Sequence, residues 1–321
     1  MKNQQRKEPF FHIQNGVLIN YIGNEDDVII PNIVTEIGNE AFEGCTEIES
    51  VKIPSGVTKI GERAFSGCSN LTNVEIPSTV SVIDRWAFEN CTSLKEINLP
   101  NSVTEIGLSA FSGCNCLEFI EIPKCVTTLS AYTFFKCSSL EIVALPPSLK
   151  EIRSFAFYDC PKLTTIEIPR DLEYLAPDAF NESKNLAEVI IDKENQHYII
   201  ENDIIYTKDK KTLILCFEGT QRKHISVSNG VEKIGESAFS NCENIEAIEL
   251  PDSVTKIGGC AFANCTGLTE IYLPPYITEI GGSAFSESSL RSIYVCGNYS
   301  VDDRCLGFCS ATVRHKNTAR G

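Results

Sequence analysis

The stretch that decides the fold is Leu71-Thr-Asn-Val74-Glu-Ile76-Pro77-Ser-Thr-Val80-Ser-Val-Ile83-Asp-Arg-Trp-Ala87-Phe88-Glu-Asn-Cys91-Thr-Ser-Leu94, because related copies of it follow one another along the 321-residue chain. Each copy carries a phenylalanine, usually after alanine, and these residues are spaced by 23 within each series. They are Phe42, Phe65, Phe88, Phe111, Phe134, Phe157 and Phe180, then Phe239, Phe262 and Phe285, with Phe308 one period further. A fixed period of this length is typical of a solenoid, in which one small unit stacks on the next.

Within one unit, the pattern of apolar residues indicates how the chain turns. Val74 and Ile76 alternate with polar residues, as in a half-buried strand, and Pro77 ends that strand. Val80 and Ile83 begin a second side of the coil, and Ala87-Phe88 then turns inward. We therefore predict a single array of about eleven or twelve turns, with the recurring phenylalanines stacked inside it.

Fifteen cysteines are present, and most of them follow the repeat. Eight stand three residues after a repeat phenylalanine: Cys45, Cys68, Cys91, Cys114, Cys137, Cys160, Cys242 and Cys265. Serine replaces cysteine at the equivalent positions Ser183 and Ser288, so the pattern does not depend on pairing. Because cysteine packs as a small buried hydrophobe, we predict reduced, buried thiols at these positions.

The unit resembles that of the BspA-like leucine-rich repeat family, which follows the pattern LxxIxLPxxVTxIGxxAFxxC. The resemblance rests on Thr58-Lys-Ile60-Gly61-Glu-Arg-Ala64-Phe65-Ser-Gly-Cys68, on Val103-Thr-Glu-Ile106-Gly107 and on Val254-Thr-Lys-Ile257-Gly258, and it covers residues 28–296. It implies a leucine-rich-repeat β-solenoid, a curved right-handed coil array with one parallel sheet on its concave face. It also implies a protein of adhesion or binding at a cell surface.

Two interruptions and the two ends divide the chain. Residues 10–22 contain an Asn-Gly hairpin signal, so residues 1–27 are predicted to form an N-terminal cap. Ile191 and Val227 are equivalent but 36 residues apart, which indicates a β-hairpin insertion at residues 192–226 between arrays at 28–191 and 227–296. Residues 297–321 are expected to form a degenerate coil and a tail. The insertion reads either as a rigid spacer or as a binding element.

The predicted concave face is acidic. Of its 24 outward-facing strand positions, eight are acidic and only Lys52 is basic. This pattern fits either a solvated edge or a surface for a cationic or neutral protein or other macromolecule. On the second interpretation the partner-binding residues are Glu75, Glu96, Phe119, Glu121, Ile142, Glu167, Glu249, Glu270 and Tyr272.

Composition argues against several other classes of function. A net charge of -15 and a pI near 4.8 do not suit a nucleic-acid-binding protein, and no apolar run suggests direct insertion into a membrane. The four histidines match neither a zinc-site spacing nor a Cys-His nucleophile arrangement. We therefore expect no catalytic residues, no cofactor, no metal and a monomer.

Three functions follow, in decreasing order of preference. The first is a non-catalytic binding or adhesion scaffold, at the cell surface or secreted as the family resemblance implies. The second is an intracellular interaction scaffold or receptor, favoured by the absence of a signal peptide and by the many apparently free thiols. The third is an enzyme with a site at the insertion, near His197, His224, Cys216, Asp203 and Asp209.

Overall fold

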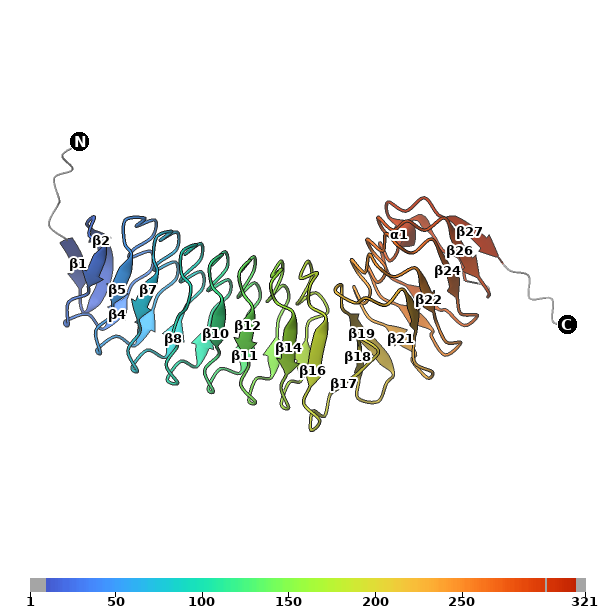
Figure 1. The fold of residues 1–321 in the computed structure, drawn as a ribbon, viewed down its shortest axis with the longest axis horizontal. Coiled ribbons are helices and arrows are strands. Elements are labelled where there is room, and N and C mark those ends of the chain that lie inside the picture. The colour runs from blue at the N-terminus through green and yellow to red at the C-terminus, as the bar shows by residue number, and fades with distance from the viewer. Residues whose placement is uncertain (1–9, 298, 316–321) are drawn as a thin grey trace. The chain divides into compact units, whose positions relative to one another are not determined.

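A computed structural model describes residues 10–297 and 299–315 of the chain. The fold is a β-solenoid of about 13 turns with parallel stacked strands, slightly more than the eleven or twelve expected (Figure 1). The chain divides into two compact units, Met1–Phe180 (unit 1) and Asn181–Gly321 (unit 2).

Unit 1 begins with an antiparallel hairpin of β1 (Phe10–Gln14) and β2 (Val17–Ile22). Asn15 and Gly16 form its turn with φ values of 51° and 81°, the left-handed conformation that tight hairpin turns require. Strand β2 then pairs in parallel with β4 (Glu36–Ile37), the first strand of the second side. The hairpin thus covers the open edge that the first turn would otherwise expose.

Two rows of short strands follow in unit 1. The strands of the first row carry the outward-facing acids, and we call their outer surface the strand face: β3 (Asp27–Ile29), β5 (Ser50–Lys52), β7 (Asn73–Glu75), β10 (Phe119–Glu121), β12 (Ile142–Ala144) and β14 (Thr165–Ile168). The second row continues from β4 with two-residue strands: β6 (Lys59–Ile60), β8 (Val82–Ile83), β9 (Glu105–Ile106), β11 (Thr128–Leu129), β13 (Glu151–Ile152) and β15 (Tyr174–Leu175).

Unit 2 repeats this plan. Its strand face carries β16 (Glu188–Ile191), β20 (His224–Ser226), β22 (Ala247–Glu249), β24 (Glu270–Leu273), β26 (Ser292–Val295) and β27 (Thr312–His315). Its second side carries β21 (Lys233–Ile234), β23 (Lys256–Ile257) and β25 (Glu279–Ile280). One short helix, α1 (Asp303–Leu306), lies in the last turn and is capped by the side chain of Asp302.

The insertion lies in unit 2 and joins its second side. The predicted hairpin is formed by β18 (Ile204–Thr207) and β19 (Thr212–Cys216), and a further antiparallel strand, β17 (Tyr198–Glu201), precedes it. Strand β19 then pairs in parallel with β21. The arrangement is the one found at the N-terminus of unit 1, where β2 pairs with β4.

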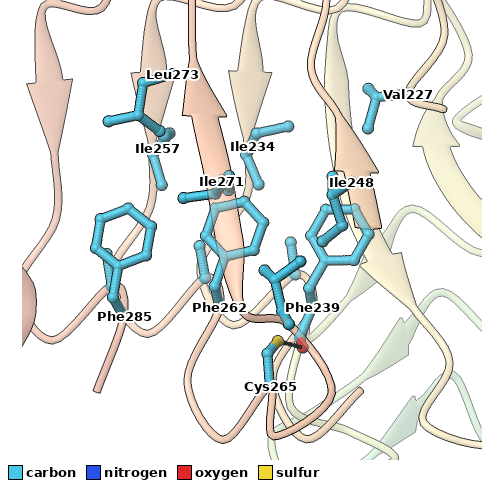
Figure 2. Packing of buried hydrophobic residues seen from close by; sticks show 14 of the residues in the cluster. Val227, Ile234, Phe239, Ile248, Ile257, Phe262, Cys265, Ile271, Leu273 and Phe285 are labelled. Carbon is cyan, nitrogen blue, oxygen red and sulfur yellow. Dashed lines mark hydrogen bonds between the residues drawn. The ribbon is translucent and has the colours of Figure 1, made fainter. Parts of the chain in front are cut away.

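The core of each unit is the predicted stack of phenylalanine rings. In unit 1 the stack runs from Phe42 to Phe180, with neighbouring ring centroids 4.9 to 5.8 Å apart and the planes nearly parallel. In unit 2, Phe239, Phe262 and Phe285 form the corresponding stack, drawn in Figure 2. Their ring centroids are 5.3 and 5.6 Å apart. Apolar strand residues pack against the rings, so each turn that carries a repeat phenylalanine from Phe42 to Phe180 and from Phe239 to Phe285 buries one aromatic side chain.

The stack of rings also explains why cysteine recurs three residues after the repeat phenylalanine. Six of the eight thiols donate to the carbonyl of the phenylalanine one turn back, at 3.0 to 3.2 Å; the Cys265–Phe239 bond is drawn in Figure 2. The Phe88 carbonyl, for example, accepts both the Cys91 amide of its own turn and the Cys114 thiol of the next. All fifteen cysteines are free, which agrees with the prediction of reduced thiols.

The prediction that Phe308 continues the stack is wrong, since its side chain is 86% exposed. Phe262 donates its amide to the Ala284 carbonyl, 22 residues on, whereas Phe285 donates to the Cys305 carbonyl, only 20 residues on. The last turn is therefore two residues shorter. Cys305 takes the alanine position, Leu306 takes the phenylalanine position, and Phe308 falls outside the coil.

Candidate partner-binding surface

The strand face presents the predicted partner-binding residues because side chains alternate along a strand. In each three-residue strand the central residue is buried and the two flanking residues point outward. Unit 1 brings six of the predicted residues onto its strand face: Glu75, Glu96, Phe119, Glu121, Ile142 and Glu167. Unit 2 holds the other three on its own strand face: Glu249, Glu270 and Tyr272.

An exposed apolar centre lies on the strand face of unit 1. Phe119 is directly opposite Ile142 in the parallel pair β10–β12, and their side chains are 42% and 59% exposed. Ala144, opposite Glu121, extends the apolar surface. Neighbouring strands are about 4.8 Å apart, so these side chains form one contiguous patch rather than isolated exposed residues.

Acidic residues surround this apolar centre. Glu96 neighbours Phe119 on one side, and Glu167 stands one repeat beyond Ala144 on the other. Glu75 differs from them, because its carboxylate forms an ion pair of 2.8 Å with Lys52 of the preceding turn. In the part of the chain that the structure describes, Glu96, Glu121 and Glu167 have no such partner. The available negative charge is therefore concentrated beside the apolar centre.

Two hollows flank the strand pair β10–β12. The smaller, of about 130 Å³, is lined by Ile97, Asn98, Leu99, Asn101, Phe119, Glu121 and Pro123. The larger, of about 400 Å³, is lined by Glu141, Ile142, Val143, Ala144, Leu145, Thr164, Thr165 and Glu167. The apolar centre therefore lies between two recesses that could receive side chains of a partner.

Each of these two hollows is lined by the leucine that precedes the repeat proline. Ile122 is buried and donates its amide to the Ala144 carbonyl at 2.9 Å. Leu99 and Leu145 occupy the equivalent position but are only half-buried. Burial at this position varies from turn to turn and does not follow the residue type, since Ile76 is also half-buried and Leu273 is buried.

On the strand face of unit 2, one row crosses four strands. Glu249, Tyr272, Tyr294 and Arg314 follow in that order from β22 to β27, and the register pairs Tyr272 with Tyr294 and Tyr294 with Arg314. The two tyrosine rings stack at 4.5 Å. Sequence reasoning missed Arg314, because the shortened last turn hides its place in the repeat. The strand face of unit 2 is consequently less uniformly acidic than the sequence suggested.

The residues considered for catalysis do not converge on one point. Cys216 is buried in the core, His224 is exposed on β20, and Asp203 binds Arg222 at 2.9 Å. Among residues 10–297 and 299–315, no three histidine, cysteine or acidic side chains are placed to hold a metal ion. The insertion thus lacks the grouping of side chains that would suggest chemistry there.

One buried carboxyl was not anticipated from the sequence. Glu218 follows β19, and burial raises its pKa to about 7. Its Oε1 accepts from the Glu182 amide at 3.0 Å and from Asn241 Nδ2 at 2.9 Å, while Oε2 is buried without a hydrogen-bond partner. No pattern in the sequence marks this residue, because its burial depends on how the insertion folds back onto the next turn.

Comparison with protein families gives one clear match. The family model described as "BspA type Leucine rich repeat region" matches six copies, over residues 13–132, 104–215 and 213–312. No curated protein matches the chain.

Three of the similar solved structures are bacterial proteins. A leucine-rich cell surface protein of Faecalibacterium prausnitzii A2-165 is 27% identical, with a TM-score of 0.76, and the match covers 99% of this chain and 95% of that one. A leucine-rich repeat protein of Bacteroides ovatus is 25% identical, with a TM-score of 0.61 and coverage of 97% and 98%. The pneumococcal vaccine antigen PcpA, 18% identical with a TM-score of 0.63 and coverage of 99% and 88%, shares the fold.

Proposed function

Because the chain belongs to the BspA-type leucine-rich repeat family, we propose that it is a non-catalytic adhesion or recognition protein that binds a macromolecular partner on its strand face. Leucine-rich repeat proteins are generally binding scaffolds rather than enzymes. The observation that carries the proposal is the exposed apolar centre of Phe119 and Ile142, bordered by unpaired acids. The partner is a protein or other macromolecule with a cationic or neutral contact surface.

The chemistry of the strand face supports this choice of partner. Glu96, Glu121 and Glu167 add their fields along the strand face, which speeds the approach of a cationic surface. Aromatic and aliphatic side chains then provide the contact energy that exposed charge alone does not. On unit 2, Glu249, Glu270 and Tyr272 offer the same combination.

We place the protein at the cell surface or in the secreted fraction. The support is the similarity to the F. prausnitzii protein, which is described as a cell surface protein. Within the described part of the chain, no helix has the length and apolar character needed to cross a bilayer. An intracellular scaffold remains the alternative, and the free thiols are the observation that favours it.

The proposal is tested with partners captured from host extracellular-matrix proteins and, in parallel, from cytosolic lysate. Association kinetics are measured for the wild type and for the triple variant Glu96→Gln, Glu121→Gln, Glu167→Gln. The matched control is Glu40→Gln, Glu47→Gln, Glu105→Gln, which removes three exposed charges of unit 1 away from the strand face. A third variant lacks residues 196–217, most of the insertion.

The strand-face variant should associate more slowly and with a weaker dependence on salt, and the control should behave like the wild type. If the partner binds the triple variant as it binds the wild type but does not bind the variant that lacks residues 196–217, the insertion is the recognition element. Equal slowing in both triple variants would mean that only net charge matters and would contradict a specific surface.

A further inference from the structure

The sheet of the strand face is open between β12 and β14. In several turns the residue before proline donates its amide to the next turn: Ile30 to the Lys52 carbonyl at 3.1 Å, Ile53 to Glu75 at 3.2 Å, and Ile122 to Ala144 at 2.9 Å. The equivalent bond would run from Leu145 to Glu167. Across the described residues of unit 1, these two backbone groups form no such bond. The opening therefore leaves one N–H donor and one C=O acceptor without the partner that the equivalent groups have in those three turns.

The 400 Å³ hollow lies at this opening and combines three kinds of wall. Ile142, Ala144 and Leu145 supply apolar surface, Thr164 and Thr165 supply polar surface, and Glu167 stands on the rim. The hollow therefore suits a side chain with a long aliphatic stem and a polar, positively charged end.

The charge in the hollow is not balanced from within unit 1. Glu141 already forms an ion pair of 3.1 Å with Lys162. The described residues offer no such cation to Glu167, whose side chain is exposed on the strand face. A ligand that enters the hollow can therefore pair with Glu167 without displacing a resident lysine or arginine.

We propose that this hollow receives an arginine side chain from an extended peptide segment of the partner. The guanidinium binds the Glu167 carboxylate and can also donate to the Glu167 carbonyl, while the aliphatic stem lies on Ile142 and Ala144. An apolar side chain two residues away in the same segment contacts Phe119. Arginine is favoured over lysine because its planar fork can serve two acceptors at once and is more weakly hydrated.

This inference rests on the proposed function and specifies which side chain of the partner is bound. Synthetic peptides of defined sequence test it directly. The first probe is an acetylated, amidated octapeptide of alternating leucine and arginine. In the second, citrulline replaces each arginine, which keeps the shape and removes the charge; in the third, lysine replaces it. Affinities are measured by calorimetry at low ionic strength with the full chain and with Glu167→Gln, Ile142→Ser and the control Glu47→Gln.

The arginine peptide should bind the wild type at least about tenfold more tightly than the citrulline peptide, and more tightly than the lysine peptide. Glu167→Gln should remove most of that preference, Ile142→Ser should weaken both peptides, and Glu47→Gln should change neither. Equal binding of arginine and citrulline peptides, or an undiminished preference in Glu167→Gln, would overturn the assignment. So would an equal loss in Glu47→Gln, or no binding of the arginine peptide.

These outcomes separate the inference from the proposed function. If the peptides bind Ile142→Ser more weakly but arginine is not preferred over citrulline, the strand face is still the binding surface and the arginine site is wrong. If a captured partner associates equally fast with the wild type and with the triple variant at Glu96, Glu121 and Glu167, the proposed function is instead contradicted.

Discussion

At the scale of single residues, most turns depend on one phenylalanine and one cysteine. The ring fills the coil and stacks on the rings before and after it, and the thiol supplies a second hydrogen bond to a buried carbonyl one turn back. A buried carbonyl oxygen that accepts too few hydrogen bonds destabilises the folded protein. A small apolar side chain with a weak donor, as cysteine has, therefore suits this position. The recurrence of these two residues in the sequence therefore reflects the same ring stacking and the same thiol–carbonyl hydrogen bond in successive turns.

Replacing Phe111 with alanine should lower the free energy of unfolding by about 3–5 kcal/mol. Its ring is fully buried, 5.5 Å from Phe88 and 5.8 Å from Phe134, so removal leaves a cavity between two stacked neighbours. Urea unfolding measures the effect. Phe308→Ala is the matched control, since that ring is exposed and should change stability little. A Phe111→Ala protein as stable as the wild type would contradict the stacked core.

The thiols should differ sharply in reactivity. Cys125 is exposed and should be alkylated in the native protein, whereas Cys114 is buried and burial raises its pKa to about 12. Because the thiolate is the reactive form, Cys114 should remain unmodified until the chain is denatured.

Peptide mapping after brief iodoacetamide treatment tests this expectation. Alkylation of Cys114 as fast as that of Cys125 would refute the burial of the cysteines that follow the repeat phenylalanines. A mass of the unreduced chain showing four or more disulfides would refute the free thiols.

At the scale of elements, the insertion carries a carboxyl whose state depends on pH. Glu218 follows β19, and its native pKa of about 7 lies above the ordinary value of 4.5 because burial disfavours the charged form. The native protein therefore holds this proton more tightly than the unfolded chain does. The contribution of Glu218 to stability is complete below about pH 4.5 and is lost as pH rises toward 7.

The free energy of unfolding of unit 2 should consequently fall by up to about 3 kcal/mol between about pH 5 and pH 8. Glu218→Gln should flatten that dependence, because the amide cannot ionise. Glu236→Gln, at an exposed acid of the same unit, should leave it intact. Hydrogen exchange in β19 and β21 provides the measurement, and an unchanged pH profile in Glu218→Gln would count against the buried carboxyl.

The sequence predicted most of the elements because one interaction pattern recurs at a fixed spacing. Val74 and Ile83 lie on the two sides of the coil as expected, and Phe88 and Cys91 are buried. A degenerate last coil was expected, but its register could not be predicted, because its length changes and Phe308 then continues the period without continuing the coil. The strand-face positions were predictable from alternation. The hollow beside Glu167 was not, since it depends on how Leu145 packs.

At the scale of the whole molecule, each turn contacts the turns next to it, so disturbance should spread locally. In Phe111→Ala, amide protection should fall most in β9 to β13 and less in turns further away. The strands β21 to β25 of unit 2 should keep their protection. Native-state hydrogen exchange with peptide resolution measures the profile. A uniform loss along the chain would show that the protein unfolds as one cooperative body instead.

The inter-turn bonds described above join residues one repeat apart, and this has an evolutionary consequence. Unequal recombination that removes Ser81 to Val103 would connect Val80 to Thr104, restoring the Val-Thr junction of a normal unit. The flanking turns would then meet through the same types of contact. Gene length can therefore vary by whole repeats while the protein still folds, and each such event resizes the surface available for recognition.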